Sequence, residues 1–156
     1  FFDLTPLFMS NLEPLTDALI ASIPAEKLAE VDSFVAVEAR GFVLASLLAQ
    51  RLGKGLVLVR KAGKLPPPVV GVGYSLEYGL DRLEMSAEVP AQKVIIVDDV
   101  LATGGTLKAV KQLAEKCNHH ILGASIFLDL PDLHADLGLT IWSVLDDKSQ
   151  PQQDVA

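Results

Sequence analysis

The sequence is poor in the features that mark several large classes of protein. Its 156 residues include a single cysteine, Cys117, which leaves no partner for an internal disulfide and fits a reducing compartment. Basic residues are outnumbered by acidic ones, 13 to 20, and the formal net charge is −7. Nucleic acid is therefore not expected as a partner, because binding to a phosphate backbone needs basic surface.

Long apolar runs are also missing. The longest mainly apolar run, residues 42–49, is far shorter than the roughly 20 residues that a membrane-spanning helix requires. The sequence shows no signal-peptide pattern, and with the lone cysteine this favours a cytoplasmic protein without a membrane partner. The first residue is Phe1 rather than methionine, so we expect that natural sequence precedes it.

Short runs of β-branched and other apolar residues are plentiful. Five of them are typical of buried strands: residues 34–38, 56–60, 93–97, 121–128 and 140–145. Helical apolar spacing occurs at residues 14–23, 25–31, 41–52 and 106–117. This alternation predicts a single α/β domain with a doubly wound, mostly parallel sheet over residues 1–148. Residues 149–156 are expected to form a flexible tail.

Residues 63–86 break the alternation. Three consecutive prolines, residues 66–68, precede several glycines and two apolar stretches on either side of Gly79. We expect a proline-stiffened loop leading into a β-hairpin. Such a hairpin could swing over a bound ligand rather than being built into the sheet. A loop of this length in a compact domain is functional or disordered.

The most informative string is VIIVDDVLATGGT, residues 94–106, directly followed by the helical pattern. A buried strand of this kind delivers Asp98 and Asp99 to the carboxyl edge of the sheet, where open α/β folds bind ligands. The next residues supply two glycines and two hydroxyls at a helix start, so backbone N–H groups and the helix dipole favour an oxyanion. Carboxylates beside a phosphate cradle suit a sugar phosphate.

Other families share parts of this string. Receiver domains of response regulators also place two aspartates after an apolar strand, but near the start of the domain, whereas Asp99 lies beyond the middle of this chain. A Walker loop is excluded, because no lysine follows the glycines in the required order. A glycine–threonine turn can also simply cap a helix.

The complete string resembles the phosphoribosyl pyrophosphate signature of the type I phosphoribosyltransferases, and VDDVLATGGT is most similar to the adenine-specific branch. Three further stretches resemble the same family in the same order: VEARGF at 37–42, VRKAGKLP at 59–66 and YSLEYG at 74–79. The resemblance implies the type I fold with a hairpin lid and a small N-terminal base-binding segment. It also implies that adenine and phosphoribosyl pyrophosphate give AMP and pyrophosphate, with Mg²⁺ as cofactor and a homodimer as the assembly.

The resemblance gives each matching residue a role. Asp98 and Asp99 would hold the ribose hydroxyls, and Glu77 would be the acid/base group at the purine. The 5′-phosphate would lie in the turn of Ala102, Thr103, Gly104, Gly105 and Thr106. Pyrophosphate would be held by Glu38, Ala39, Arg40, Arg60, Lys61 and Lys64, with Arg40 facing the leaving group. The base would contact Phe1, Phe2, Val100 and Tyr78.

Two further expectations come from the family alone. Its pyrophosphate loop carries a cis peptide bond just before the Arg-Gly pair, which predicts a cis bond between Glu38 and Ala39. The Mg²⁺ ion would be held mainly by substrate oxygens and water, without protein ligands. The sequence departs from the family at Phe2, where arginine is usual, and at residues 67–69, where the family loop is more polar.

Plainer alternatives stay open at this point. Glu77 alone would be an ordinary hairpin residue, Arg40 could pair with Glu38 or cap a helix, and the basic residues between 40 and 64 could be a solvated face. Another purine, such as hypoxanthine, guanine or xanthine, could replace adenine, because backbone groups read the base in this fold. A non-catalytic regulator that senses phosphoribosyl pyrophosphate is a third alternative, although such regulators usually add a DNA-binding domain.

Overall fold

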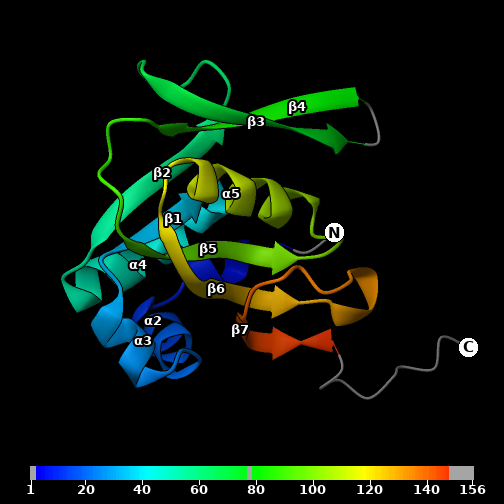
Figure 1. Cartoon of the computed structure of the whole chain (residues 1–156). Coiled ribbons are helices and arrows are strands. Elements are labelled where there is room, and N and C mark those ends of the chain that lie inside the picture. Colours follow the sequence, from blue (N-terminus) through cyan, green and yellow to red (C-terminus); the bar gives the residue numbers. More distant parts are fainter. Residues whose placement is uncertain (1–2, 77–78, 148–156) are drawn as a thin grey trace, which may run out of the picture.

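The computed structural model describes residues 3–76 and 79–147, which form one sheet covered by helices on both faces (Figure 1). The described strands are β1 Ser33–Val37, β2 Gly55–Lys61, β3 Val69–Leu76, β4 Gly79–Ser86, β5 Lys93–Leu101, β6 His120–Asp129 and β7 Ile141–Asp146. The described helices are α1 Thr5–Phe8, α2 Glu13–Ala21, α3 Ala25–Glu30, α4 Arg40–Leu52 and α5 Gly105–Lys116, together with a short 3-10 helix, η1 Pro131–Leu133.

The sheet order is β3-β4-β2-β1-β5-β6-β7. Every neighbouring pair from β2 to β7 runs parallel, whereas β4 pairs antiparallel with both β2 and β3. This arrangement confirms the predicted α/β fold with a mostly parallel sheet. No helix in the described ranges is long and apolar enough to cross a membrane.

Successive residues of the central strands point into two different cores. On one face, Leu113 of α5 shares a core with Val35 of β1 and Ile96 of β5. On the other, α2 and α4 cover Phe34 and Ile95. The five residues of β1 are all buried for this reason, which explains why a parallel strand appears in the sequence as a continuous apolar run.

The predicted elements agree with the observed ones to within one or two residues, with a few exceptions. β5 continues four residues beyond the predicted end at 97, because the strand runs through the acidic pair while still paired with β6. The short helices α1 and η1 were not predicted. Each is too short to show helical periodicity.

The hairpin differs from the expectation, and the prediction that it stands free of the sheet is wrong. β3 begins at Val69, inside the expected loop, and β4 pairs with β2 from Val59↔Met85 to Lys61↔Leu83. Leu83 and Met85 are buried in the same core as α5, so apolar burial anchors the base of the hairpin. Towards the tip, Gly79 and Leu80 are exposed and extend past the end of the pairing with β2.

The parallel strands bring several chain segments to one edge of the sheet. β1 leads there into Glu38 and the start of α4, and β5 leads into the turn before α5. The start of α4 lies directly on β5: a Cβ atom at Gly41 would be 2.7 Å from the Val97 carbonyl oxygen. Glycine at this position therefore allows the two segments to approach closely.

Candidate active site

A cavity of about 720 Å³ opens at this edge of the sheet. Its wall combines residues that lie far apart in the sequence, from Glu38 at the end of β1 to Leu133 in η1. Among the predicted site residues, the lining includes Glu38, Ala39, Arg40, Lys61, Asp98, Asp99, Val100 and the turn of residues 102–106. Arg60 and Lys64 reach the same region through their contacts with Glu38.

Glu38 gathers two basic side chains at one end of the cavity. Its carboxylate accepts hydrogen bonds from Arg60 Nε and Lys64 Nζ, each at 2.9 Å. The bond from Lys64, followed by that from Arg60, lowers the pKa of Glu38 against the opposing effect of burial. The peptide bond between Glu38 and Ala39 is cis, so this prediction is confirmed.

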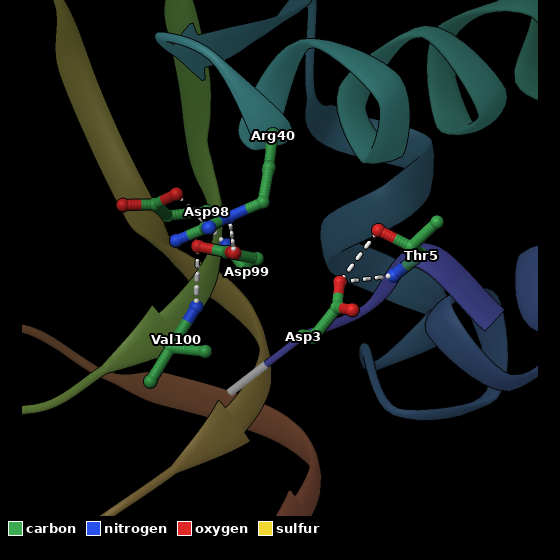
Figure 2. Close-up of polar contacts among 6 residues, drawn as sticks. All are labelled: Asp3, Thr5, Arg40, Asp98, Asp99 and Val100. Carbon is green, nitrogen blue, oxygen red and sulfur yellow. Dashed lines mark hydrogen bonds and ion pairs between the residues drawn. The ribbon is translucent and has the colours of Figure 1, made fainter. Parts of the chain in front are cut away.

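Two further cations at this end are paired with carboxylates. The Arg40 guanidinium donates to the buried carboxylate of Asp99 (Figure 2). Lys61 Nζ lies 3.4 Å from Asp81 Oδ2 on β4, and Tyr74 of β3 donates to the same oxygen at 3.4 Å. The part of the hairpin beyond its pairing with β2 is thus linked to the cationic end of the cavity.

The acidic pair occupies the middle of the cavity. The Asp99 N–H donates to Asp98 Oδ1 and the Val100 N–H to Asp99 Oδ1, both at 2.8 Å (Figure 2). Burial, and then the neighbouring charge of Asp99, raise the pKa of Asp98 well above the usual value of a carboxyl group. Hydroxyl donors or a cation would relieve this repulsion.

The turn at the opposite end is an open helix start. Gly104 has φ 89° and is the N-cap of α5, and no side chain caps this described helix end. The first N–H groups of α5 are therefore available to an anion, with the positive end of the helix dipole behind them. Thr103 and Gly105 are exposed.

The N-terminal segment approaches the cavity on the side of Arg40, which lies near Asp3 (Figure 2). Leu4 is buried in the α2–α4 core, and the Asp3 carboxylate accepts bonds from Thr5 N–H at 2.9 Å and Thr5 Oγ1 at 2.5 Å (Figure 2). Four predicted residues, Phe1, Phe2, Glu77 and Tyr78, lie outside the described residues.

One wall of the cavity was not predicted. Leu130 and Leu133, which follow β6, line it, and His134 and Asp129 lie beside them. The sequence analysis found no motif in this stretch. An apolar Leu–x–x–Leu spacing after a strand is too common to indicate a site. Within residues 3–76 and 79–147, no three His, Cys, Asp or Glu side chains group as ligands for a metal ion.

Comparisons with known proteins assign the family. The phosphoribosyl transferase domain family matches residues 10–152. The adenine phosphoribosyltransferase of Mycolicibacterium smegmatis is 46% identical over 138 residues, covering 85% of this chain and 74% of that protein. That of Rhodococcus jostii is 44% identical over 138 residues, covering 85% of this chain and 75% of that protein.

The chain belongs to the adenine phosphoribosyltransferases. Solved structures of this family share its fold. The Saccharomyces cerevisiae adenine phosphoribosyltransferase superposes with a TM-score of 0.85 at 35% identity, over 93% of this chain and 86% of that one. The Rhodothermus marinus enzyme gives 0.83 at 34% identity, over 94% and 86%. Membership in this enzyme family decides against the non-catalytic regulator.

Proposed function

We propose that the chain transfers the phosphoribosyl group of phosphoribosyl pyrophosphate to adenine, releasing AMP and pyrophosphate with the help of Mg²⁺. The observation that carries this proposal is the order of groups along one cavity: cations, an acidic pair, and an open helix start. That order matches pyrophosphate, ribose and 5′-phosphate. The relatives named adenine phosphoribosyltransferase support adenine as the base, and the yeast relative was crystallised with adenine.

The 5′-phosphate lies at the start of α5, and the ribose lies at the end of β5. The phosphate accepts hydrogen bonds from the amides of the turn at residues 102–106, and the ribose hydroxyls donate to Asp98 and Asp99. Both contacts exist before the reaction begins, so they bind the substrate rather than select the transition state. They fix C1′ in place for attack by the base.

The leaving pyrophosphate lies among Arg40, Arg60, Lys61 and Lys64. Negative charge grows on it as the bond from C1′ breaks, so preorganised donors stabilise the transition state, with about 3 kcal/mol typical of one such donor. In this proposal Glu38 contributes as a positioning residue. Its ionised carboxylate repels an anion but holds Arg60 and Lys64 in place.

A magnesium ion fits this arrangement as a partner of the substrate. Asp98 and Asp99 provide the oxygen chemistry that Mg²⁺ prefers, but Asp99 is already paired with Arg40. We therefore propose that phosphoribosyl pyrophosphate oxygens and water hold the ion. When bound, it supplies Lewis-acid stabilisation to the departing pyrophosphate.

The base would lie against Val100, with Phe1, Phe2 and Tyr78 as further contacts and Glu77 as the acid/base group. Removing a proton from the purine ring makes its attacking nitrogen a better nucleophile. Such proton transfer contributes about 10²–10⁴-fold to the rate. We also propose a cytoplasmic homodimer. The oligomeric state can be measured by sedimentation of the purified chain.

The direct test is an assay with phosphoribosyl pyrophosphate and Mg²⁺ against adenine, hypoxanthine, guanine and xanthine in turn. Formation of AMP, far faster than any other nucleotide, is expected. A preference for another base would replace adenine in the proposal. Full activity in excess chelator would remove Mg²⁺ from it.

Glu77→Gln tests the acid/base assignment. Glutamine keeps the size and an acceptor oxygen but cannot carry a proton, so kcat and kcat/KM for adenine should both fall by about 10²-fold. Phosphoribosyl pyrophosphate binding, measured by calorimetry without the base, should be unchanged. Activity within a few-fold of the parent would show that Glu77 is not the proton carrier.

A further inference from the structure

The segment after β6, residues 130–139, covers the turn that precedes α5. The Leu130 N–H donates to the Leu101 carbonyl at 2.9 Å, which ties the segment to the end of β5. A Cβ atom at Gly104 would lie 3.0 Å from Leu137 Cδ2 and 3.6 Å from His134 Cβ. Lys111 on α5 donates to the Leu137 carbonyl at 3.3 Å. The segment therefore packs directly on the backbone of the turn.

The His134 ring makes two polar contacts that hold this segment. Its Nε2 lies 2.8 Å from Asp129 Oδ1, and its Nδ1 lies 2.9 Å from the Ala135 carbonyl oxygen. Both partners are acceptors. A neutral imidazole carries one N–H and satisfies one of them, whereas an imidazolium donates to both. The His134 and Asp129 side chains are only 11% and 14% exposed, so water does not easily replace the bond between them.

The surroundings also favour the charged ring. The bond to Ala135, followed by that to Asp129, raises the pKa of His134 above its usual value of 6.5. Other charged groups on the segment and on the elements packed against it are Asp132 and Asp136 on the segment, Asp146 beside Asp129 on β7, and Lys111 on α5. Among these groups and Asp129, only the charge of Asp129 raises the pKa of His134.

We propose that His134 is a positioning residue for the 5′-phosphate. As an imidazolium it ties residues 130–139 to Asp129 and so holds Gly104 and the amides of the turn in their binding arrangement. The inference rests on the proposed function, which puts the 5′-phosphate in this turn. Because the pKa of His134 is raised by folding, the stabilisation is fully present below about pH 6.5 and is lost as pH rises through the folded value.

The test measures AMP binding by calorimetry between pH 5.5 and 9 for the parent, His134→Gln and the control His120→Gln, which changes an exposed histidine. At pH 6, His134→Gln should bind AMP about fivefold more weakly than the parent, a modest coupling between two sites. The difference should disappear at high pH. The AMP phosphate itself ionises near pH 6, but this step is common to all variants and cancels in the ratio. The control should follow the parent.

Two measurements keep the proposal testable if His134→Gln folds poorly. Imidazole NMR signals of the parent should show that saturating AMP raises the pKa of His134, because coupling between two binding events is reciprocal. Asp129→Asn, which keeps an acceptor oxygen without its charge, should move the pH dependence of AMP binding to lower pH. An unchanged pKa of His134 in the AMP complex, or a pH-independent affinity ratio, would overturn the proposal. Failure of the parent to bind AMP at all would instead contradict the proposed function.

Discussion

In the proposed function, the two ends of the cavity bind anions by different means. At the pyrophosphate end, long basic side chains from β2, the loop after it and α4 are each paired with a carboxylate of the chain itself. At the phosphate end, the donors are backbone amides at the start of α5, and the segment after β6 packs behind them. In this proposal, the group that stays bound throughout the reaction meets backbone amides, whereas the group that must leave meets side chains that have other partners.

This contrast makes AMP and phosphoribosyl pyrophosphate complementary probes. Both carry the 5′-phosphate, but only phosphoribosyl pyrophosphate carries the pyrophosphate. A defect at the phosphate end should weaken both ligands. A defect at the pyrophosphate end should weaken phosphoribosyl pyrophosphate alone.

Gly104→Ala should have the largest effect. An L-residue at φ 89° is strained by about 1–2 kcal/mol, and the new methyl group would meet Leu137 at 3.0 Å. If the turn shifts and one amide loses the phosphate, about 1.5–3 kcal/mol of binding is lost. AMP affinity and the phosphoribosyl pyrophosphate KM should therefore both worsen by about tenfold to a hundredfold, as measured by calorimetry and steady-state kinetics.

Gly53→Ala is the matched control for this change. Gly53 also has positive φ, 64°, at the end of α4, and a Cβ atom there meets nothing within 4 Å. It should lose comparable stability while keeping both affinities. AMP affinity within twofold of the parent in Gly104→Ala would show that the turn does not bind the phosphate.

Glu38→Gln should have a smaller and more selective effect. It releases Arg60 and Lys64, and ordering these two long side chains for pyrophosphate then costs conformational entropy. Removing the negative charge of Glu38 also reduces its repulsion of pyrophosphate. Solvent screens this gain, because both cations are partly exposed. The phosphoribosyl pyrophosphate KM should rise about threefold to fivefold, in line with about 1 kcal/mol for partly exposed ion pairs, while AMP affinity stays unchanged.

Glu30→Gln provides the comparison for Glu38, since Glu30 also contacts two lysines, Lys27 and Lys93, away from the cavity. Glu30→Gln should change neither the affinity for AMP nor the KM of phosphoribosyl pyrophosphate. Tighter binding of phosphoribosyl pyrophosphate by Glu38→Gln would mean that Glu38 competes with pyrophosphate instead of positioning its cations.

Asp98→Asn should raise the stability of the free protein slightly. The raised pKa of Asp98 in the folded protein means that its contribution to stability is present below about pH 4 and is lost as pH rises. Asparagine can still accept the Asp99 N–H without carrying a charge. The Tm at pH 7 should rise by about 3 °C, roughly 1 kcal/mol at this chain length.

The advantage of Asp98→Asn should shrink as pH approaches 4, where the parent is also neutral at this position. Binding of AMP should weaken about tenfold, because a neutral acceptor replaces a charged one for the ribose hydroxyls. A lower Tm at neutral pH would indicate that the carboxylate stabilises the free protein, contrary to the direction of its pKa.

The sequence predicts the central strands, the helices that cover them and the turn before α5 because each of these depends on local information. Apolar periodicity identifies the strands, and the string from Val94 to Thr106 identifies the turn. The attachment of the hairpin was not predictable in the same way, since it depends on the register between β2 and β4. Whether a hairpin joins a sheet is decided by a partner strand, not by its own residues.

The contacts within the site were equally hidden. The sequence indicates which cations belong to the site but not that Arg40 pairs with Asp99 or that Lys61 pairs with Asp81. Residues 130–139 carry no motif, so their place against Gly104 emerged only from the fold. Pairings of this kind depend on the three-dimensional positions of side chains.

The strand order has a consequence for how the protein acquires its site. β1 lies between β2 and β5, and Arg40 pairs with Asp99 at a sequence separation of 59 residues. Contacts of such high contact order form late and slowly, because the entropy of closing a long loop is paid before any pairing is gained. No early hairpin or helix pair can contain the cavity. A ligand of the cavity therefore cannot bind until the fold has formed. Once bound, it slows unfolding.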